Sequence, residues 1–146
     1  MRDPKALYQQ LILEHNRRPC NHKKMPQASH EAQGFNPLCG DQLQLYLKVE
    51  EERLAALSFQ GKGCAISQAS ASMMTSILKG LSLTQALSVQ ESFLTLLQGK
   101  LSSEKTQDLG KLAVFGEIWR YPSRVKCASL AWHTLKEALE GPKESL

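Results

Sequence analysis

The chain has 146 residues, of which 42% are hydrophobic and 22% are charged, so it can bury a real core as one domain and is not compositionally disordered. Aromatic residues make up 6%, and the net charge of +4 is spread without a dense basic stripe, so we expect no nucleic-acid binding. No apolar run reaches the roughly 18 residues that span a membrane. The N-terminus carries no recognisable signal peptide, and we expect a cytoplasmic protein without membrane contact.

The first part of the chain predicts one helix and one antiparallel hairpin. Apolar residues recur at helical spacing over residues 3–16. Residues 17–38 are rich in Pro, Asn, Gln and His, show no apolar period, and predict an extended surface segment. Residues 42–49 alternate apolar and polar side chains, which predicts a half-buried strand. A turn at 50–53 and a second strand over 54–60 complete the hairpin.

The second part of the chain predicts helices. Ser82 is a typical N-cap, Gly80 and Gly99 are typical helix ends, and residues 121–124 read as a turn. The expected helices cover residues 67–79, 83–98, 104–118 and 125–140. Strands early and helices late predict an α+β fold, with helices packed on one face of a small antiparallel sheet of about three strands. We expect residues 1–146 to form a single domain with a loose tail at about 141–146.

Three cysteines sit at the boundaries of the predicted elements. Cys39 lies in a turn before the first strand of the hairpin, Cys64 in a glycine-flanked loop before a helix, and Cys127 at the start of the last helix. Such positions favour thiolate, because backbone N–H groups point at the sulfur. Three thiolates and the carboxylate of Asp41 would complete a tetrahedral shell for zinc.

The spacing of these cysteines does not by itself establish a metal site. The chain has no Cys-x-x-Cys pair, and a free cysteine is often just a small buried hydrophobic residue. In a reducing cytosol, however, four cysteines fit ligands or reactive groups better than a disulfide framework. The fourth, Cys20, lies in a polar loop and is interpreted as an incidental thiol.

Three segments together resemble a known family. Asn36-Pro-Leu-Cys-Gly-Asp41, the segment 61–74 and the segment 122–132 closely resemble the three cysteine motifs of the SufU branch of the IscU/NifU N-terminal family. The resemblance extends from about Tyr8 to Leu139. It implies an IscU/SufU-like fold and one zinc ion per chain, held by Cys39, Asp41, Cys64 and Cys127.

The same resemblance implies a function in iron–sulfur cluster biogenesis. A SufU-like protein is a zinc-dependent sulfurtransferase that accepts persulfide sulfur from a SufS-type cysteine desulfurase, here on Cys39, and supplies downstream Suf scaffold proteins. We expect a monomer or a weak dimer. Arg124 and Lys126 could steer the desulfurase or stabilise negative charge on sulfur, although a merely solvated helix start is equally compatible with both residues.

Two other interpretations remain open. In the first, the chain is an IscU-like scaffold on which the same residues assemble a transient [2Fe–2S] cluster. IscU-type scaffolds carry histidine before the late cysteine, whereas this chain has Lys126, which carries no lone pair while charged and favours the sulfurtransferase. In the second, zinc is purely structural and the protein only binds a partner.

Overall fold

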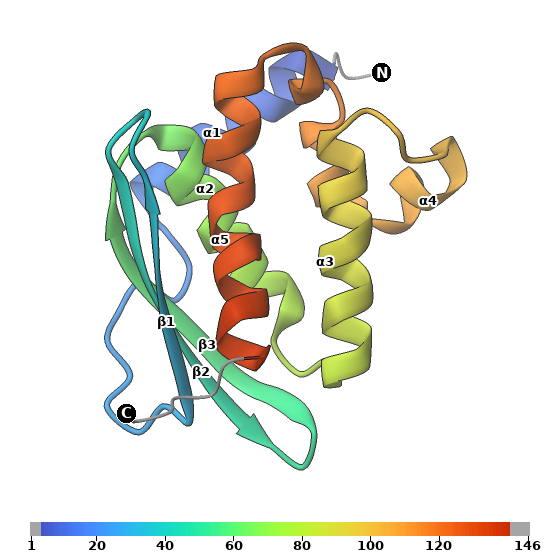
Figure 1. Ribbon diagram of the computed structural model, residues 1–146. Coiled ribbons are helices and arrows are strands. Elements are labelled where there is room, and N and C mark those ends of the chain that lie inside the picture. The colour runs from blue at the N-terminus through green and yellow to red at the C-terminus, as the bar shows by residue number, and fades with distance from the viewer. Residues whose placement is uncertain (1–3, 141–146) are drawn as a thin grey trace.

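The computed structural model describes residues 4–140, and the tail predicted to be loose at 141–146 lies outside them. Figure 1 shows a sheet on one side of the molecule and helices on the other. The elements in chain order are α1 (Pro4–Arg17), β1 (His30–Asn36), β2 (Asp41–Glu50), β3 (Arg53–Lys62), α2 (Ala65–Leu78), α3 (Leu83–Leu97), α4 (Ser103–Asp108), the 3-10 turns η1 (Gly110–Phe115) and η2 (Ile118–Arg120), and α5 (Pro122–Glu140).

The sheet has three antiparallel strands in the order β1-β2-β3. Leu43, Leu45 and Leu47 on β2 are buried and alternate with more exposed residues, as the sequence predicts. Glu51 and Glu52 both have positive φ, at 49° and 62°, which is the conformation that a two-residue hairpin turn of type I′ requires. The predicted hairpin is therefore confirmed.

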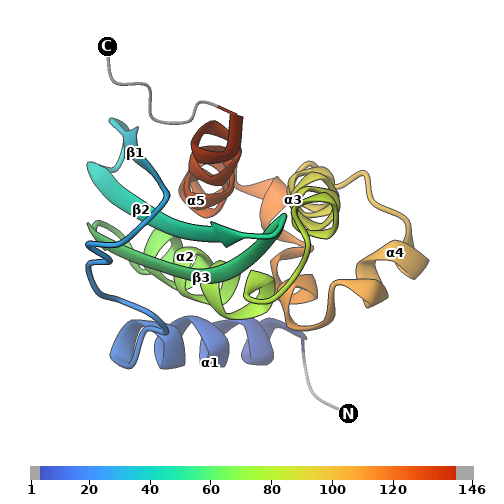
Figure 2. The ribbon, with the colours of Figure 1, turned by 90° about the horizontal axis from the view of Figure 1, so that it is seen from below.

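The helices that touch the sheet pack on one of its faces. Helix α5 contacts β1 and β2, α2 contacts β3, and α2 and α5 contact each other, while α1 covers α2 from outside (Figure 2). Trp132 on α5 is fully buried, stacks on Phe93 of α3, and donates its indole N–H to Ser70 Oγ on α2 at 3.0 Å. The small residues of α2 thus allow three helices to meet closely, and the predicted α+β architecture is confirmed.

Three local predictions were wrong. The segment 17–38, predicted to be an extended surface segment, contains strand β1, which pairs with β2 from His30 opposite Leu47 to Asn36 opposite Asp41. The helix predicted over 104–118 is broken into α4, η1 and η2, because Gly110 adopts a φ of +59° that ends the first of them. Residues 121–124 are not a separate turn, since α5 begins at Pro122, a favoured first helical residue.

None of the helices within residues 4–140 is both long and apolar enough to cross a membrane.

Candidate metal centre

Asp41 anchors the candidate site from the first position of β2. It is fully buried, and its Oδ1 accepts the backbone N–H of Cys64 at 2.8 Å. Its Oδ2 accepts the side-chain amide of Asn36 at 3.2 Å and lies 3.9 Å from the Cys64 sulfur. A buried carboxylate needs such donors, because burial without partners is costly. The two oxygens therefore connect the start of β2 to the end of β1 and to the start of α2.

Asn36 is a residue of the candidate site that the sequence analysis did not predict as part of it. It is buried at the end of β1, and its Oδ1 accepts the backbone N–H of Leu38 at 3.3 Å, which shapes the turn that carries Cys39. Its Nδ2 lies 3.8 Å from the Cys127 sulfur. Asparagine before proline in the first cysteine motif signals a turn, but nothing in the sequence indicates the contact with Cys127.

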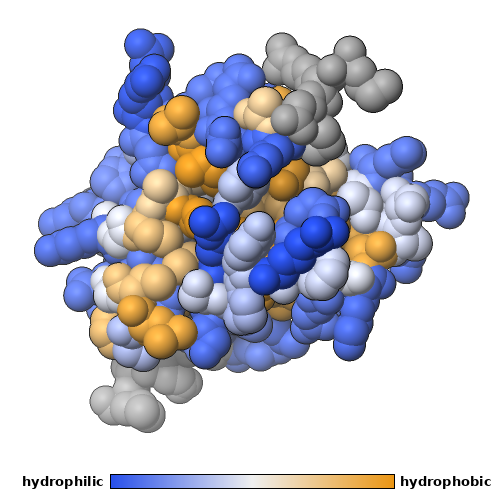
Figure 3. Space-filling view, turned by 90° about the horizontal axis from the view of Figure 1, so that it is seen from above, coloured by the Kyte–Doolittle hydropathy of each residue, from blue (hydrophilic) through white to orange (hydrophobic). Residues whose placement is uncertain are grey.

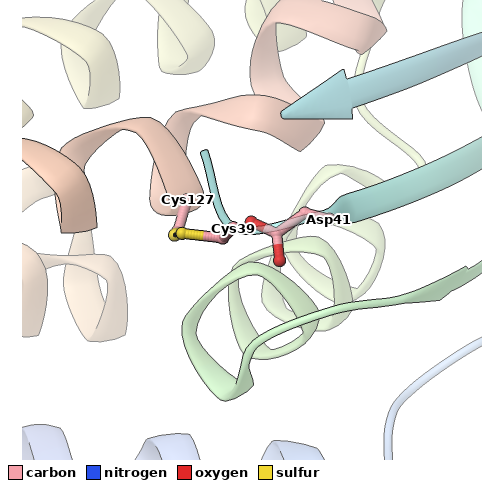
Figure 4. Close-up of side chains that lie close together, drawn as sticks. All are labelled: Cys39, Asp41 and Cys127. Atoms are coloured by element: carbon pink, nitrogen blue, oxygen red, sulfur yellow. Dashed lines mark hydrogen bonds between the residues drawn. The ribbon is translucent and has the colours of Figure 1, made fainter. Parts of the chain in front are cut away.

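Cys39 and Cys127 bring their sulfur atoms together from opposite ends of the chain. The two Sγ atoms are 3.3 Å apart, and both thiols are free. Cys39 is exposed in the turn between β1 and β2, whereas Cys127 is buried on α5. Figure 4 shows both side chains converging beside the carboxylate of Asp41. The fold thus brings together three of the four predicted ligands, whose donor atoms all lie within 4.8 Å of one another.

Cys64, the fourth predicted ligand, lies beside Cys39, Asp41 and Cys127 but is not one of the three residues whose donor atoms are within 4.8 Å of one another. It is the N-cap of α2, and its sulfur accepts the backbone N–H of Ser67 at 3.4 Å. Gly63 precedes it with a φ of +146°, and a Cβ there would lie 2.8 Å from the Asp41 Cα. Only glycine allows the loop to pass this close to Asp41. The Cys64 sulfur remains 3.9 Å from Asp41 Oδ2, so a small side-chain movement would bring it to a shared ion.

Burial raises the pKa of the Cys127 thiol above its ordinary range, and hydrogen bonds with Cys39, Cys64 and Asp41 raise it further. Without a metal ion this sulfur therefore stays protonated at neutral pH. A bound metal ion reverses that preference, since metal binding releases the thiol proton. Three soft sulfur donors and one carboxylate oxygen suit zinc, a borderline-soft ion with tetrahedral preference. The donor set therefore fits the predicted metal.

The remaining predicted residues lie outside this centre. Arg124 is exposed and lies over the Tyr121 ring, 4.6 Å from the ring centre. Lys126 is exposed on the first turns of α5 and forms no salt bridge within residues 4–140. The backbone N–H of Cys20 donates to Ser72 Oγ at 2.7 Å, and Cys20 is not part of the ligand group.

Two exposed apolar side chains lie close in the chain to Asn36 and Cys39. Phe35 and Leu38, on either side of the Asn36-Pro37 step, are 60% and 63% exposed. Figure 3, which views the molecule from above, shows apolar residues gathered toward the sheet side of this face among polar ones. Exposed apolar patches of this kind are typical of surfaces that bind another protein.

The chain is similar to known proteins in sequence and in fold. Residues 7–128 match the NifU-like N-terminal domain. The chain is 35% identical to the iron–sulfur cluster assembly scaffold protein IscU of Streptococcus pyogenes, covering 92% of this chain and 83% of that protein. It is 37% identical to the zinc-dependent sulfurtransferase SufU of Bacillus subtilis, covering 92% and 90%. A crystal structure from Fervidobacterium islandicum, described as a candidate scaffold protein for the SUF system, superposes with a TM-score of 0.84 at 33% identity, covering 92% and 97%.

Proposed function

This chain belongs to the NifU-like N-terminal domain family, and its relatives named above include an iron–sulfur cluster assembly scaffold protein and a zinc-dependent sulfurtransferase. On this premise we propose that it accepts persulfide sulfur on Cys39 from a SufS-type cysteine desulfurase. The ligands in this proposal are Cys39, Asp41, Cys64 and Cys127, with one zinc ion per chain. Zinc would hold these sulfurs as thiolates and guard them from oxidation.

The observation that supports Cys39 as the acceptor is the difference in exposure among the four donors. Asp41 and Cys127 are buried and Cys64 is half-buried, whereas Cys39 is exposed on a turn. A donor protein can therefore reach Cys39 while the other three groups stay in place. The Cys39 thiolate attacks the terminal sulfur of the donor persulfide. A new S–S bond forms at Cys39, the S–S bond of the donor breaks, and the donor cysteine leaves as a thiolate.

The experiment that tests this proposal compares cysteine variants in the presence of a SufS-type desulfurase and free cysteine. Wild type is expected to gain the mass of one sulfur atom and to accelerate alanine release by the desulfurase. Cys39→Ser is expected to do neither. Cys20→Ser is the matched control, because Cys20 lies outside the ligand group, and it is expected to behave as wild type. Unchanged desulfurase stimulation by Cys39→Ser would defeat the acceptor role and leave the structural-zinc interpretation.

A second candidate function is a scaffold for a transient [2Fe–2S] cluster. It is favoured by the name of the Streptococcus relative, a cluster assembly scaffold, at nearly the same identity as the sulfurtransferase. A carboxylate among sulfur ligands would make such a cluster easier to transfer.

Metal analysis of protein purified without added metal or chelator distinguishes the two functions. About one zinc per chain is expected for the sulfurtransferase. The scaffold function would be favoured instead if the protein contained iron with acid-labile sulfide. It would also be favoured if, after anaerobic reconstitution, the protein transferred an intact cluster to an apo-ferredoxin.

A further inference from the structure

A large hollow lies beside α1, away from the metal ligands. Its volume is about 1190 Å³, and it is lined by α1, the segments around α4, the two 3-10 turns and the start of α5. Figure 2 shows α1 running past the segment that contains these turns. Pockets for small molecules measure about 300–1,000 Å³. The hollow exceeds that range, which favours a segment of polypeptide over a small ligand.

Two half-exposed aromatic residues line this hollow. Trp119 is 45% exposed and Tyr121 is 50% exposed. A Cβ on Gly99 would lie 2.8 Å from Trp119 Cγ, so the indole ring packs directly on the Gly99 backbone. Large aromatic side chains that remain partly open to solvent are typical anchors for protein partners.

The charged side chains of the hollow are mostly basic. Lys111, Arg120 and Arg124 all line it. Among the residues that the structure describes, its one lining carboxylate is that of Glu117, which is paired with Arg120 at 3.1 Å. Within residues 4–140, Lys111 and Arg124 have no carboxylate partner. An occupant that carries carboxylates would therefore meet two uncompensated cations. We call this hollow the basic groove and define it by Leu101, Lys111, Trp119, Arg120, Tyr121 and Arg124.

The basic groove leads toward the metal centre. A second hollow of about 390 Å³ shares Tyr8, Gln9 and Arg124 with it and reaches Ile66 on the first turn of α2. Ile66 follows Cys64 closely in the chain, and Arg124 lies one helical turn before Cys127 on α5. A chain segment lying along α1 could thus occupy both hollows and end beside the site.

From the half-exposed aromatic side chains, the cations without carboxylate partners and the size of the hollow, we propose that the basic groove binds an extended segment of a partner protein in which Asp or Glu residues flank large apolar side chains. The inference goes beyond the proposed function and holds whether the metal centre carries zinc or a cluster. Electrostatic attraction would speed the encounter, and burial of apolar side chains against Trp119 and Tyr121 would hold the complex.

The experiment uses a short synthetic peptide that alternates Glu with Leu and Phe, and a matched peptide in which Lys replaces each Glu. The two tryptophans provide a built-in comparison in isotope-labelled protein, since Trp119 is half-exposed in the groove and Trp132 is fully buried. The acidic peptide is expected to shift the indole N–H signal of Trp119 and leave that of Trp132 unchanged. The basic peptide is expected to shift neither.

Charge reversal at the groove supplies the second arm. Lys111→Glu is expected to weaken binding of the acidic peptide by at least about fivefold, whereas Lys79→Glu, an equal charge change at the end of α2, leaves it unchanged. The proposal is overturned if the acidic peptide leaves the Trp119 signal in place, or if both reversals act equally. It is also overturned if the Trp119 signal changes with protein concentration alone, because the occupant would then be a second copy of this chain.

Discussion

At the scale of single residues, the geometry of the metal centre depends on Gly63. Replacing it with alanine forces a left-handed φ on a residue with a Cβ and drives that Cβ against Asp41, 2.9 Å from its Cγ. We expect Gly63→Ala to lower the free energy of unfolding by about 2–3 kcal/mol and to reduce zinc content. Urea unfolding and elemental analysis check the two effects.

Gly80→Ala is the control that separates the effect of a positive φ from the effect of the clash between a Cβ at position 63 and Asp41. Gly80 has a φ of +88° but no atom within 4 Å of a Cβ, and it lies at the end of α2. We expect a loss of about 1 kcal/mol from the positive φ alone, with zinc content unchanged. Equal losses of stability and of zinc in both variants would contradict the steric role of Gly63.

The hydroxyl group of Tyr8 provides a second prediction at this scale. It is buried and has no hydrogen-bond partner among residues 4–140, and burial raises the pKa of Tyr8. Since an unpaired buried hydroxyl is unfavourable, we expect Tyr8→Phe to be neutral or to stabilise the protein by up to about 1 kcal/mol. Tyr46→Phe is the matched comparison, because the Tyr46 hydroxyl donates to Gln60 at 2.8 Å and its loss should destabilise by about 1 kcal/mol. Thermal unfolding of both variants is the measurement, and destabilisation of both by the same amount would count against this explanation.

At the scale of elements, we expect the contact between α1 and α2 to depend on pH. His15 Nδ1 on α1 lies 2.6 Å from Ser72 Oγ on α2, and that oxygen also accepts the backbone N–H of Cys20. A neutral imidazole can accept the Ser72 hydroxyl proton, whereas a protonated one cannot. Burial lowers the pKa of His15, the effect of nearby Lys111 lowers it further, and Glu14 acts in the opposite direction.

The sign of the pH dependence follows from this lowered pKa. The unfolded chain binds the His15 proton more readily than the folded one, so the contribution of His15 is present above about pH 6.5 and is lost as the pH falls through its folded-state pKa. Water screens the charge on this partly exposed imidazole, so we expect the free energy of unfolding to decrease by less than about 1 kcal/mol. As the pH is lowered, the urea midpoint of wild type should decrease more steeply than that of His15→Gln. His133→Gln, a change at an exposed position on α5, should keep the wild-type slope, and identical slopes in all three proteins would refute the assignment.

Of the three strands, the two that the sequence predicted are those whose buried face carries large apolar side chains. Strand β2 can be recognised in the sequence by Leu43, Leu45 and Leu47, which are buried in the core. Strand β1 gives no such signal, because the face it turns to α5 is nearly bare: a Cβ on Gly34 would lie 3.0 Å from Leu130 Cδ1. Its large side chain, Phe35, is 60% exposed instead. Close helix packing thus removed the apolar alternation by which a strand is recognised.

The same distinction applies to the candidate site. The cysteine motifs predict four ligands, which are Cys39, Asp41, Cys64 and Cys127. The fold brings the donor atoms of three of them, Cys39, Asp41 and Cys127, close together. Asn36 could not be identified, because its link to Cys127 joins residues 91 positions apart through the pairing of β1 and the packing of α5. Contacts of this kind depend on tertiary structure and leave no local pattern.

At the scale of the whole molecule, the metal centre joins elements from both halves of the chain. Asn36 ends β1, Asp41 begins β2, Cys64 caps α2, and Cys127 lies on α5. A metal ion bound here would link the sheet directly to the two helices that pack against it. Because the ligands come together only in the folded chain, binding free energy adds to folding stability.

We therefore expect zinc to raise the thermal stability of the entire domain. At a free zinc concentration a hundredfold above Kd, stabilisation is about 2.7 kcal/mol, or an increase in Tm of about 5–10 °C for a domain of this size. Calorimetry of the zinc-loaded and chelator-treated protein measures it. Cys127→Ser should abolish the increase, since the buried ligand is lost, whereas Cys20→Ser should retain all of it. An equal Tm with and without zinc would mean that the four groups do not form a metal site in solution, and the role of Cys39 would then rest on its exposed thiol alone.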